Sequence, residues 1–183
     1  MNNKKKILLL SDDARMHSGI ATMSRELILG TVHKYHWCQI AGAIKHPETG
    51  KVIDISQAVQ QQTKVPDAYV RLYPTDGYGN EQLLFSVIEH EKPDAVLHFT
   101  DPRYWGWLYA IENQIRQKIP LTYLNIWDSL PYCQWNRPFY ESCDALFSIS
   151  KQTYNINKWV LRPDKCITLD GALDEFGNLN QTI

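Results

Sequence analysis

KILLLSDDARMHSGIATMSREL, residues 6–27, decides the fold of this chain. Four consecutive apolar residues, Ile7–Leu10, form the pattern of a strand that is covered on both faces in a parallel sheet. The polar run 11–18 then leads into a helix that begins at Gly19, with Ser18 as its candidate N-cap. A buried strand, a polar loop and an amphipathic helix in this order predict the first unit of a parallel α/β sheet. Since an edge strand rarely carries a wholly apolar run, we expect this strand to be central.

Strand and helix patterns alternate along the rest of the chain, which predicts a doubly wound, mostly parallel, Rossmann-like α/β sheet. We expect strands over residues 37–44, 68–73, 95–99, 121–126, 145–149 and 166–169, and a hairpin return or edge strand over 51–56. We expect helices over residues 83–91, 105–118, 139–143 and 151–160. The pattern predicts one domain over residues 1–170, followed by the start of a linker or tail over 171–183.

Composition and charge narrow the class of protein. The 183 residues include 19 Lys and Arg against 20 Asp and Glu, a net charge of −1, which gives no general attraction to nucleic acid or to an acidic membrane. The apolar run that starts at Ile7 is shorter than the roughly seven to fifteen residues of an export signal. The cysteines at 38, 133, 143 and 166 are scattered and are expected to be reduced thiols. We therefore expect a soluble cytoplasmic protein.

Polar residues that directly follow the predicted strands are the candidates for chemistry, because ligands of open α/β sheets bind at the carboxyl ends of the strands. These ends share one rim, so residues far apart in sequence converge there. The candidates are Asp12, Asp13, Arg15, His17, Ser18, Gly19, Thr100, Asp101, Arg103, Asp128, Ser129, Ser150 and Lys151.

The first loop has two interpretations. Ser18, Gly19 and Ile20 open a helix, and free backbone amides at a helix N-terminus bind phosphate. The alternative is an ordinary serine N-cap, because the loop contains neither common glycine-rich phosphate motif. The pair Asp12 and Asp13 resembles the acidic pair of receiver domains, but the other residues of that site are missing, so we expect the two carboxylates to cap the loop or to be solvated.

Asp101 and Asp128 are the leading candidates for a polar group at the substrate, because each directly follows an apolar strand. The alternative for each is a helix cap or a salt bridge, to Arg103 or to Arg137. His98 lies at the penultimate position of its strand, where a histidine is more often a core side chain than a catalyst.

Aromatic residues crowd two of the rim loops. Rings in such loops serve as platforms for sugars or bases, and the alternative is packing under a long loop. The residues are Tyr104, Trp105, Trp107, Trp127, Tyr132 and Trp135. The only cluster with zinc-compatible residues, His33-x-x-His36-x-Cys38, has a spacing that matches no common structural site, so we expect no metal.

Four segments in order resemble the N-terminal domain of a GT-B glycosyltransferase, and the nearest group is the large retaining family 4. They are KILLLSDDARMHSGIATMSREL (6–27), EKPDAVLHFTD (91–101), SCDALFSISKQTYN (142–155) and CITLDGALDEFGNL (166–179). The resemblance covers almost the whole chain. It departs from the family in the first loop, which has one glycine where members usually have two.

The resemblance implies that this domain supplies the acceptor side of a sugar transfer from a nucleotide-sugar donor. Ser18, Gly19 and Ile20 would then face the donor diphosphate. Asp101 and Asp128 are the expected catalytic carboxylates, and the expected acceptor groove contains His17, His98, Arg103, Tyr104, Trp127 and Tyr132. The resemblance implies no metal and no cofactor, with helix dipoles and basic side chains stabilising the leaving diphosphate.

The family's second domain, which holds most nucleotide-sugar contacts, has no counterpart in this sequence. We expect it to act in cis or in trans, and we expect the isolated chain to be inactive. Two other functions stay open: a stand-alone nucleotide- or phosphate-binding α/β module, and a non-catalytic interaction protein. The donor sugar and the acceptor (glycan, lipid, protein or modified nucleobase) also stay open.

Overall fold

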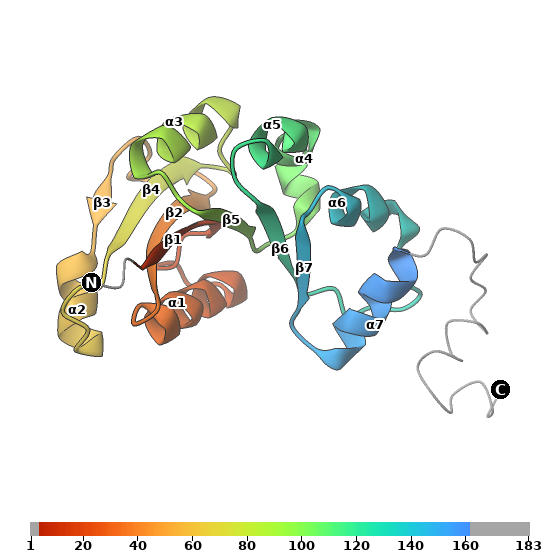
Figure 1. The fold of residues 1–183 in the computed structure, drawn as a ribbon, viewed down its shortest axis with the longest axis horizontal. Helices are drawn as coiled ribbons and strands as arrows, with labels where there is room; N and C mark the ends of the chain where they lie inside the picture. Colours follow the sequence, from red (N-terminus) through yellow and green to blue (C-terminus); the bar gives the residue numbers. More distant parts are fainter. Residues whose placement is uncertain (1–3, 162–183) are drawn as a thin grey trace.

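The computed structural model describes residues 4–161 and contains a seven-stranded sheet in the order β3-β4-β2-β1-β5-β6-β7 (Figure 1). Every neighbouring pair is parallel except β3 and β4. The predicted α/β class and the central position of the first strand are both confirmed. The strands are β1 (Lys5–Asp12), β2 (Tyr35–Ala43), β3 (Ile53–Asp54), β4 (Val70–Asp76), β5 (Ala95–His98), β6 (Leu121–Asn125) and β7 (Ala145–Ser148).

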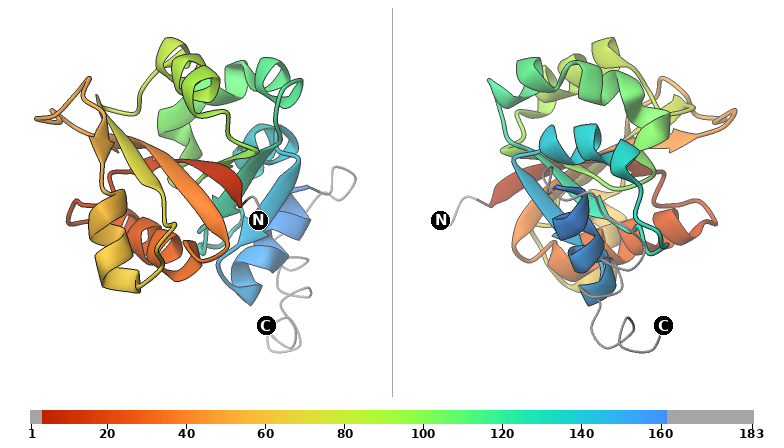
Figure 2. Two further views of the ribbon diagram at one scale, coloured as in Figure 1. Left: turned by 60° about the vertical axis from the view of Figure 1, so that its left-hand side comes forward. Right: turned by 90° about the vertical axis from the view of Figure 1, so that its right-hand side faces the viewer.

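Helices cover both faces of the sheet, as Figures 1 and 2 show from three directions. One face carries α1 (Gly19–Thr31) and α2 (Ser56–Thr63). The other face carries α3 (Glu81–Glu91), α4 (Gly106–Ala110), α5 (Glu112–Arg116) and α6 (Arg137–Glu141). The last helix, α7 (Lys151–Val160), packs with α6 beside β7. No helix in residues 4–161 is long and apolar enough to cross a membrane.

Successive residues of β1 point into different cores, which explains its uninterrupted apolar run. Leu8 and Leu10 pack with the helices α3, α4 and α5, whereas Leu9 packs with α1 and α2. All three leucines are fully buried. At about 25 cal/mol per Å² of buried apolar surface, each contributes roughly 1.5–3 kcal/mol.

One open alternative is decided by the structure, and two details differ from the expected elements. Residues 53–54 form an edge strand, as one of the two alternatives for this segment proposed, and the strand pairs antiparallel with β4. The sequence pattern gave no sign of α2, because Val59 is its only buried residue. The single helix expected over 105–118 is wrong: Ile111, at φ −111° and ψ 15°, separates α4 from α5. The expected strand 166–169 and the tail 171–183 lie outside the described residues.

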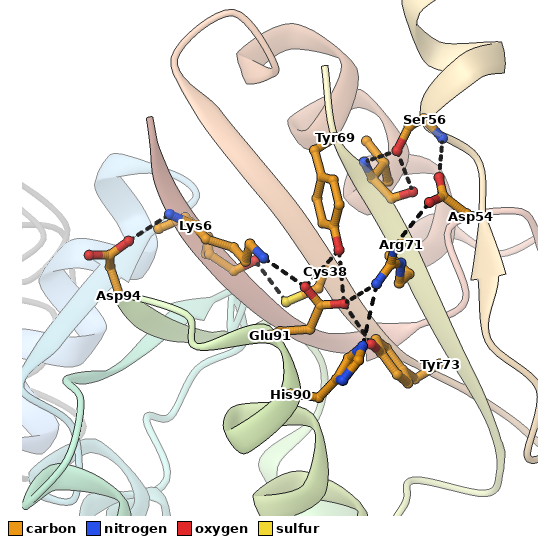
Figure 3. A network of polar contacts seen from close by, with 12 residues as sticks. Lys6, Cys38, Asp54, Ser56, Tyr69, Arg71, Tyr73, His90, Glu91 and Asp94 are labelled. Atoms are coloured by element: carbon orange, nitrogen blue, oxygen red, sulfur yellow. Dashed lines mark hydrogen bonds and ion pairs between the residues drawn. The ribbon is translucent and has the colours of Figure 1, made fainter. Parts of the chain in front are cut away.

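A network of polar contacts joins the start of the sheet to the end of α3 (Figure 3). The Glu91 carboxylate, with 1% of its side chain exposed, accepts hydrogen bonds from Lys6 Nζ at 2.7 Å, Tyr73 Oη at 2.6 Å and Tyr69 Oη at 2.8 Å. Arg71 Nη1 lies 3.3 Å from Glu91 Oε1. Both carboxylate oxygens are engaged by donors, and the network lies at the amino edge of the sheet, away from the expected site. We therefore assign it to stability.

Candidate site at the carboxyl rim of the sheet

The strand order places a binding crevice above the centre of the sheet. Without the short edge strand β3, the order of the six parallel strands is third, second, first, fourth, fifth, sixth along the chain. The order therefore reverses between β1 and β5, and crevices for ligands form at the carboxyl ends of such neighbouring strands. The loops that leave β1 and β5, which carry the candidate residues, both begin at this point.

The first loop ends in a capped helix N-terminus. Ser18 Oγ accepts a hydrogen bond from the Ala21 amide at 3.0 Å, and donates one to Asp12 Oδ2 at 2.8 Å. The cap predicted for Ser18 is therefore present. The amides of Gly19 and Ile20 belong to the first turn, where N–H groups have no acceptor within the helix.

A cavity of about 430 Å³ opens beside this helix terminus. The first loop contributes Asp12, Met16, His17 and Ser18 to its lining, the end of β2 and the next residue contribute Gly42, Ala43 and Ile44, and the loop after β4 contributes Tyr78. The cavity thus combines a carboxylate, a hydroxyl, an imidazole and an aromatic ring. This set of groups suits a polar ligand with an apolar face.

Tyr78 is a residue of this site that the sequence did not single out. Its ring stacks on Tyr104, with centroids 5.1 Å apart and planes 14° from parallel, so loops that follow β4 and β5 meet above the central strands. Gly77 and Gly79 on either side of it have φ of 64° and 73°, a backbone conformation that favours glycine. The available signal was an aromatic residue between two glycines just after an apolar strand.

Asp13 is the buried centre of the first loop and caps it, one of the two expected alternatives: its Oδ1 accepts a hydrogen bond from the Arg15 amide at 2.8 Å, and it is not solvated. Its side chain is 0% exposed, and it binds Arg15 Nη2 at 2.7 Å and His46 Nε2 at 2.9 Å. Burial acts to raise the pKa of Asp13, but the hydrogen bonds from Arg15 and His46 lower it below its usual value. The Glu48 amide donates a hydrogen bond to His46 Nδ1 at 3.1 Å, so the ring hydrogen is on Nε2. Nε2 then donates a hydrogen bond to the Asp13 carboxylate. Both imidazole nitrogens of His46 are thus hydrogen-bonded, and the bond between His46 and Asp13 joins the loop after β2 to the first loop.

Gly42 lies where β2 meets the loop that carries Tyr78. A Cβ atom at residue 42 would stand 2.7 Å from the carbonyl oxygen of Gly77, which is backbone and cannot move away cheaply. We expect Gly42→Ala to lower the free energy of unfolding by about 1–3 kcal/mol, the usual cost of overpacking. Urea unfolding followed by circular dichroism measures the change.

Gly30→Ala is the matched control. Gly30 is exposed within α1 and nothing lies within 4 Å of an added Cβ. We expect this variant to gain about 0.5–1 kcal/mol, because alanine favours a helix. Equal stabilities of the two variants would contradict the close approach at Gly42.

Asp101 has both structural roles that the sequence offered as alternatives. It caps the short 3-10 helix Pro102–Trp105, accepting the Arg103 amide at 2.9 Å, and both of its oxygens bind the Arg103 guanidinium. Burial acts to raise the pKa of Asp101, but the bonds from Arg103 lower it. The carboxylate is therefore ionised at neutral pH, and as a base it is weak. Its side chain is 27% exposed, so it still reaches the surface of the rim.

His98 lies beneath the rim and lines no open surface in this structure. It is fully buried, its Nδ1 lies 2.7 Å from Tyr109 Oη, and its ring stacks on Tyr123 at 5.0 Å. Burial lowers the pKa of His98 to about 3, so the ring is neutral at physiological pH. Its place is that of a core histidine, the alternative favoured from the sequence.

The remaining predicted residues divide between surface and core. Arg103, Tyr104 and Asp128 are exposed, and Trp127 is half-buried. Tyr132 is buried and its ring stacks on Trp159 at 6.1 Å. Burial therefore separates Arg103, Tyr104, Trp127 and Asp128, which reach the surface, from His98 and Tyr132, which belong to the core.

Another cavity, of about 440 Å³, lies on the sheet face beside α1. Its lining is almost wholly apolar and includes Leu27, Leu97 and Phe147. It presents no acid, base or cation, so we do not assign chemistry to it.

Within residues 4–161, no group of three or more His, Cys, Asp or Glu side chains is arranged to hold a metal ion. Comparisons of the chain with protein-family models, with curated proteins and with solved structures found no match.

Proposed function

We propose that this chain is the acceptor-side domain of a retaining glycosyltransferase of the GT-B type, which transfers a sugar from a nucleotide-sugar donor. A second domain, in cis or in trans, would provide most of the contacts to the donor. The proposal combines the resemblance of four sequence segments with the position and chemistry of the rim.

The cavity beside the N-terminus of α1 is the observation that carries the proposal. Its polar lining joins the Asp12 carboxylate and the Ser18 hydroxyl to the ring of Tyr78. A sugar presents hydroxyl groups at its edge and C–H groups on its face, which match carboxylates and aromatic rings respectively. The backbone amides of Gly19 and Ile20 lie at the N-terminus of α1 in the same region. There the helix dipole and the N–H groups would stabilise a donor phosphate.

Asp12 argues against the alternative in which this loop binds a phosphate unaided. Its carboxylate bonds Ser18 Oγ at 2.8 Å, next to the helix terminus that a phosphate would approach. A diphosphate at this helix terminus would lie close to the Asp12 carboxylate, and the two negative charges would repel each other. Its binding therefore needs positive charge from outside this loop. A donor domain with basic side chains would supply that charge.

Sugar transfer by a joined protein tests the proposal. The chain is fused after residue 183 to the donor-binding domain of a family 4 glycosyltransferase, and nucleotide release is followed with a panel of UDP, GDP and ADP sugars. We expect the chain alone to release no nucleotide, because it lacks most of the donor site. Robust turnover by the 183-residue chain alone would refute this division of labour.

A further inference from the structure

We propose that the acceptor is a glycan chain of several sugar units, which lies along a strip of aromatic side chains on the rim. The inference rests on the proposed function, since the glycan is the acceptor of the same transfer. The rim strip is defined as Tyr78, Tyr104, Trp127 and Trp135 together with the ion pair Asp101–Arg103.

The rim strip follows the order of the strands. Tyr78 comes from the loop after β4, Tyr104 from the 3-10 helix that follows β5, Trp127 from the loop after β6, and Trp135 from the next 3-10 helix, Gln134–Asn136. The four rings form two contacting pairs: Tyr78 stacks on Tyr104 at 5.1 Å, and Trp127 meets Trp135 at 5.5 Å. The strip therefore begins at the cavity and continues across the carboxyl ends of the central strands.

Arg103 joins the two aromatic pairs. It is the neighbour of Tyr104 in sequence, and its guanidinium lies over the ring of Trp135, 5.4 Å from the centroid. Its partner Asp101 fixes its orientation through several hydrogen bonds. The result is a polar group between two aromatic platforms, an arrangement that matches sugar rings with hydroxyl groups around them.

The exposure of these rings requires a reason. Tyr104 is 58% exposed and Trp135 is 45% exposed, although both carry large apolar surfaces. Neighbouring exposed aromatic groups mark binding surfaces more often than isolated ones do. Each stacked ring is worth about 0.5–1.5 kcal/mol, so several sugars are needed for useful affinity.

Charge favours a glycan over a nucleic acid, the other polymer that stacks on aromatic rings. The rim carries the carboxylates of Asp12, Asp13, Asp101 and Asp128 against the cations Arg15, Arg103 and Lys151, and both arginines are already paired, Arg15 with Asp13 and Arg103 with Asp101. A phosphate backbone would be repelled by these carboxylates, whereas sugar hydroxyls donate hydrogen bonds to them. A neutral or weakly charged glycan fits both features of the strip.

Titration of the full chain with oligosaccharides tests the inference. Tryptophan fluorescence is recorded with glucose, maltotriose, maltoheptaose, cellohexaose and chitohexaose as probes, and with a fifteen-residue oligothymidylate. We expect at least one sugar series to bind, with affinity that rises about tenfold or more from the shortest to the longest member. Trp135→Ala and Tyr104→Ala are each expected to weaken that binding about tenfold, as loss of one stacked ring predicts.

Tyr35→Ala is the matched control, because Tyr35 is 37% exposed at the amino end of the inner strand β2, opposite the carboxyl rim that carries the strip. It should bind like the parent chain, and circular dichroism checks that all variants are folded. Failure of every sugar to bind, binding that does not depend on chain length, or binding that Trp135→Ala and Tyr104→Ala leave intact would overturn the inference. Binding of the oligothymidylate in place of the sugars would also overturn it.

The inference and the proposed function fail separately. If glycans bind along the strip but the joined protein transfers no sugar, the glycan site stands and the transferase does not. If the joined protein transfers sugar to single sugars as well as to chains, the transferase stands and the extended acceptor site does not.

Discussion

Glu91→Ala is expected to lower the free energy of unfolding by about 3 kcal/mol, near the lower end of the 3–5 kcal/mol that breaking a buried ion pair costs. The change leaves Lys6 and Arg71 without their shared carboxylate and leaves the hydroxyls of Tyr69 and Tyr73 without an acceptor. The value lies at the low end because the side chains of Lys6 and Arg71 are 22% and 26% exposed, so water compensates part of the loss.

The same carboxylate gives a pH dependence of known sign. Burial acts to raise the pKa of Glu91, but hydrogen bonds from Lys6, Tyr73 and Tyr69 lower it below the unfolded value. A carboxyl group with a lowered folded pKa stabilises the fold above its unfolded pKa, and this stabilisation is lost as the pH falls through the folded pKa. The difference between parent and Glu91→Ala is therefore expected to be full at pH 7 and to shrink below about pH 4.

Urea unfolding of the parent chain and of Glu91→Ala, at pH 7 and again below about pH 4, measures this effect. Glu141→Gln is the matched control, because the ion pair of Glu141 with Arg137 lies on the surface and is expected to contribute less than about 0.5 kcal/mol. A Glu91→Ala variant as stable as Glu141→Gln would show that the network in Figure 3 contributes little.

Asp101→Asn is expected to lower kcat of the joined protein about a hundredfold, the lower end of what a positioned polar group contributes at a reacting centre. The lowered pKa of Asp101 makes it an acceptor for a hydroxyl group of the substrate and a holder of Arg103, not a strong base. Asparagine is a good helix cap, so the variant should keep the 3-10 helix Pro102–Trp105.

Asp128→Asn provides the comparison. Asp128 is exposed and its carboxylate bonds Ser129 Oγ at 3.3 Å, so it lacks the fixed geometry of Asp101. We expect a smaller loss of kcat there, with the Tm of both variants close to that of the parent. If both variants keep full activity, or if both unfold, the two carboxylates are structural and the assignment is wrong.

The parts of the fold that local patterns determine could be predicted from the sequence. The apolar run that starts at Ile7 identified the central strand, and Ser18 identified the start of α1, because burial on two faces and N-capping leave local signatures. The helix α2 left no such signature, since tertiary packing of Val59 holds it in place.

The candidate site was less predictable, because its geometry depends on contacts between distant residues. The rim itself followed from topology, but the stacking of Tyr78 on Tyr104 joins two loops that no local pattern connects. Burial, too, distinguishes residues that look alike in sequence. Asp13 is fully buried, whereas its neighbour Asp12 borders the cavity.

Transfer of a radiolabelled sugar by the joined protein tests the central claim most directly. The assay compares the joined protein with the chain alone and with the donor-binding domain alone, using the nucleotide-sugar panel and the oligosaccharide probes as acceptors. If the rim is the acceptor side, only the joined protein forms labelled glycan, and the Asp101→Asn variant of the joined protein loses that product. No product from any donor and acceptor pair, or an equal yield from the donor-binding domain alone, would contradict it.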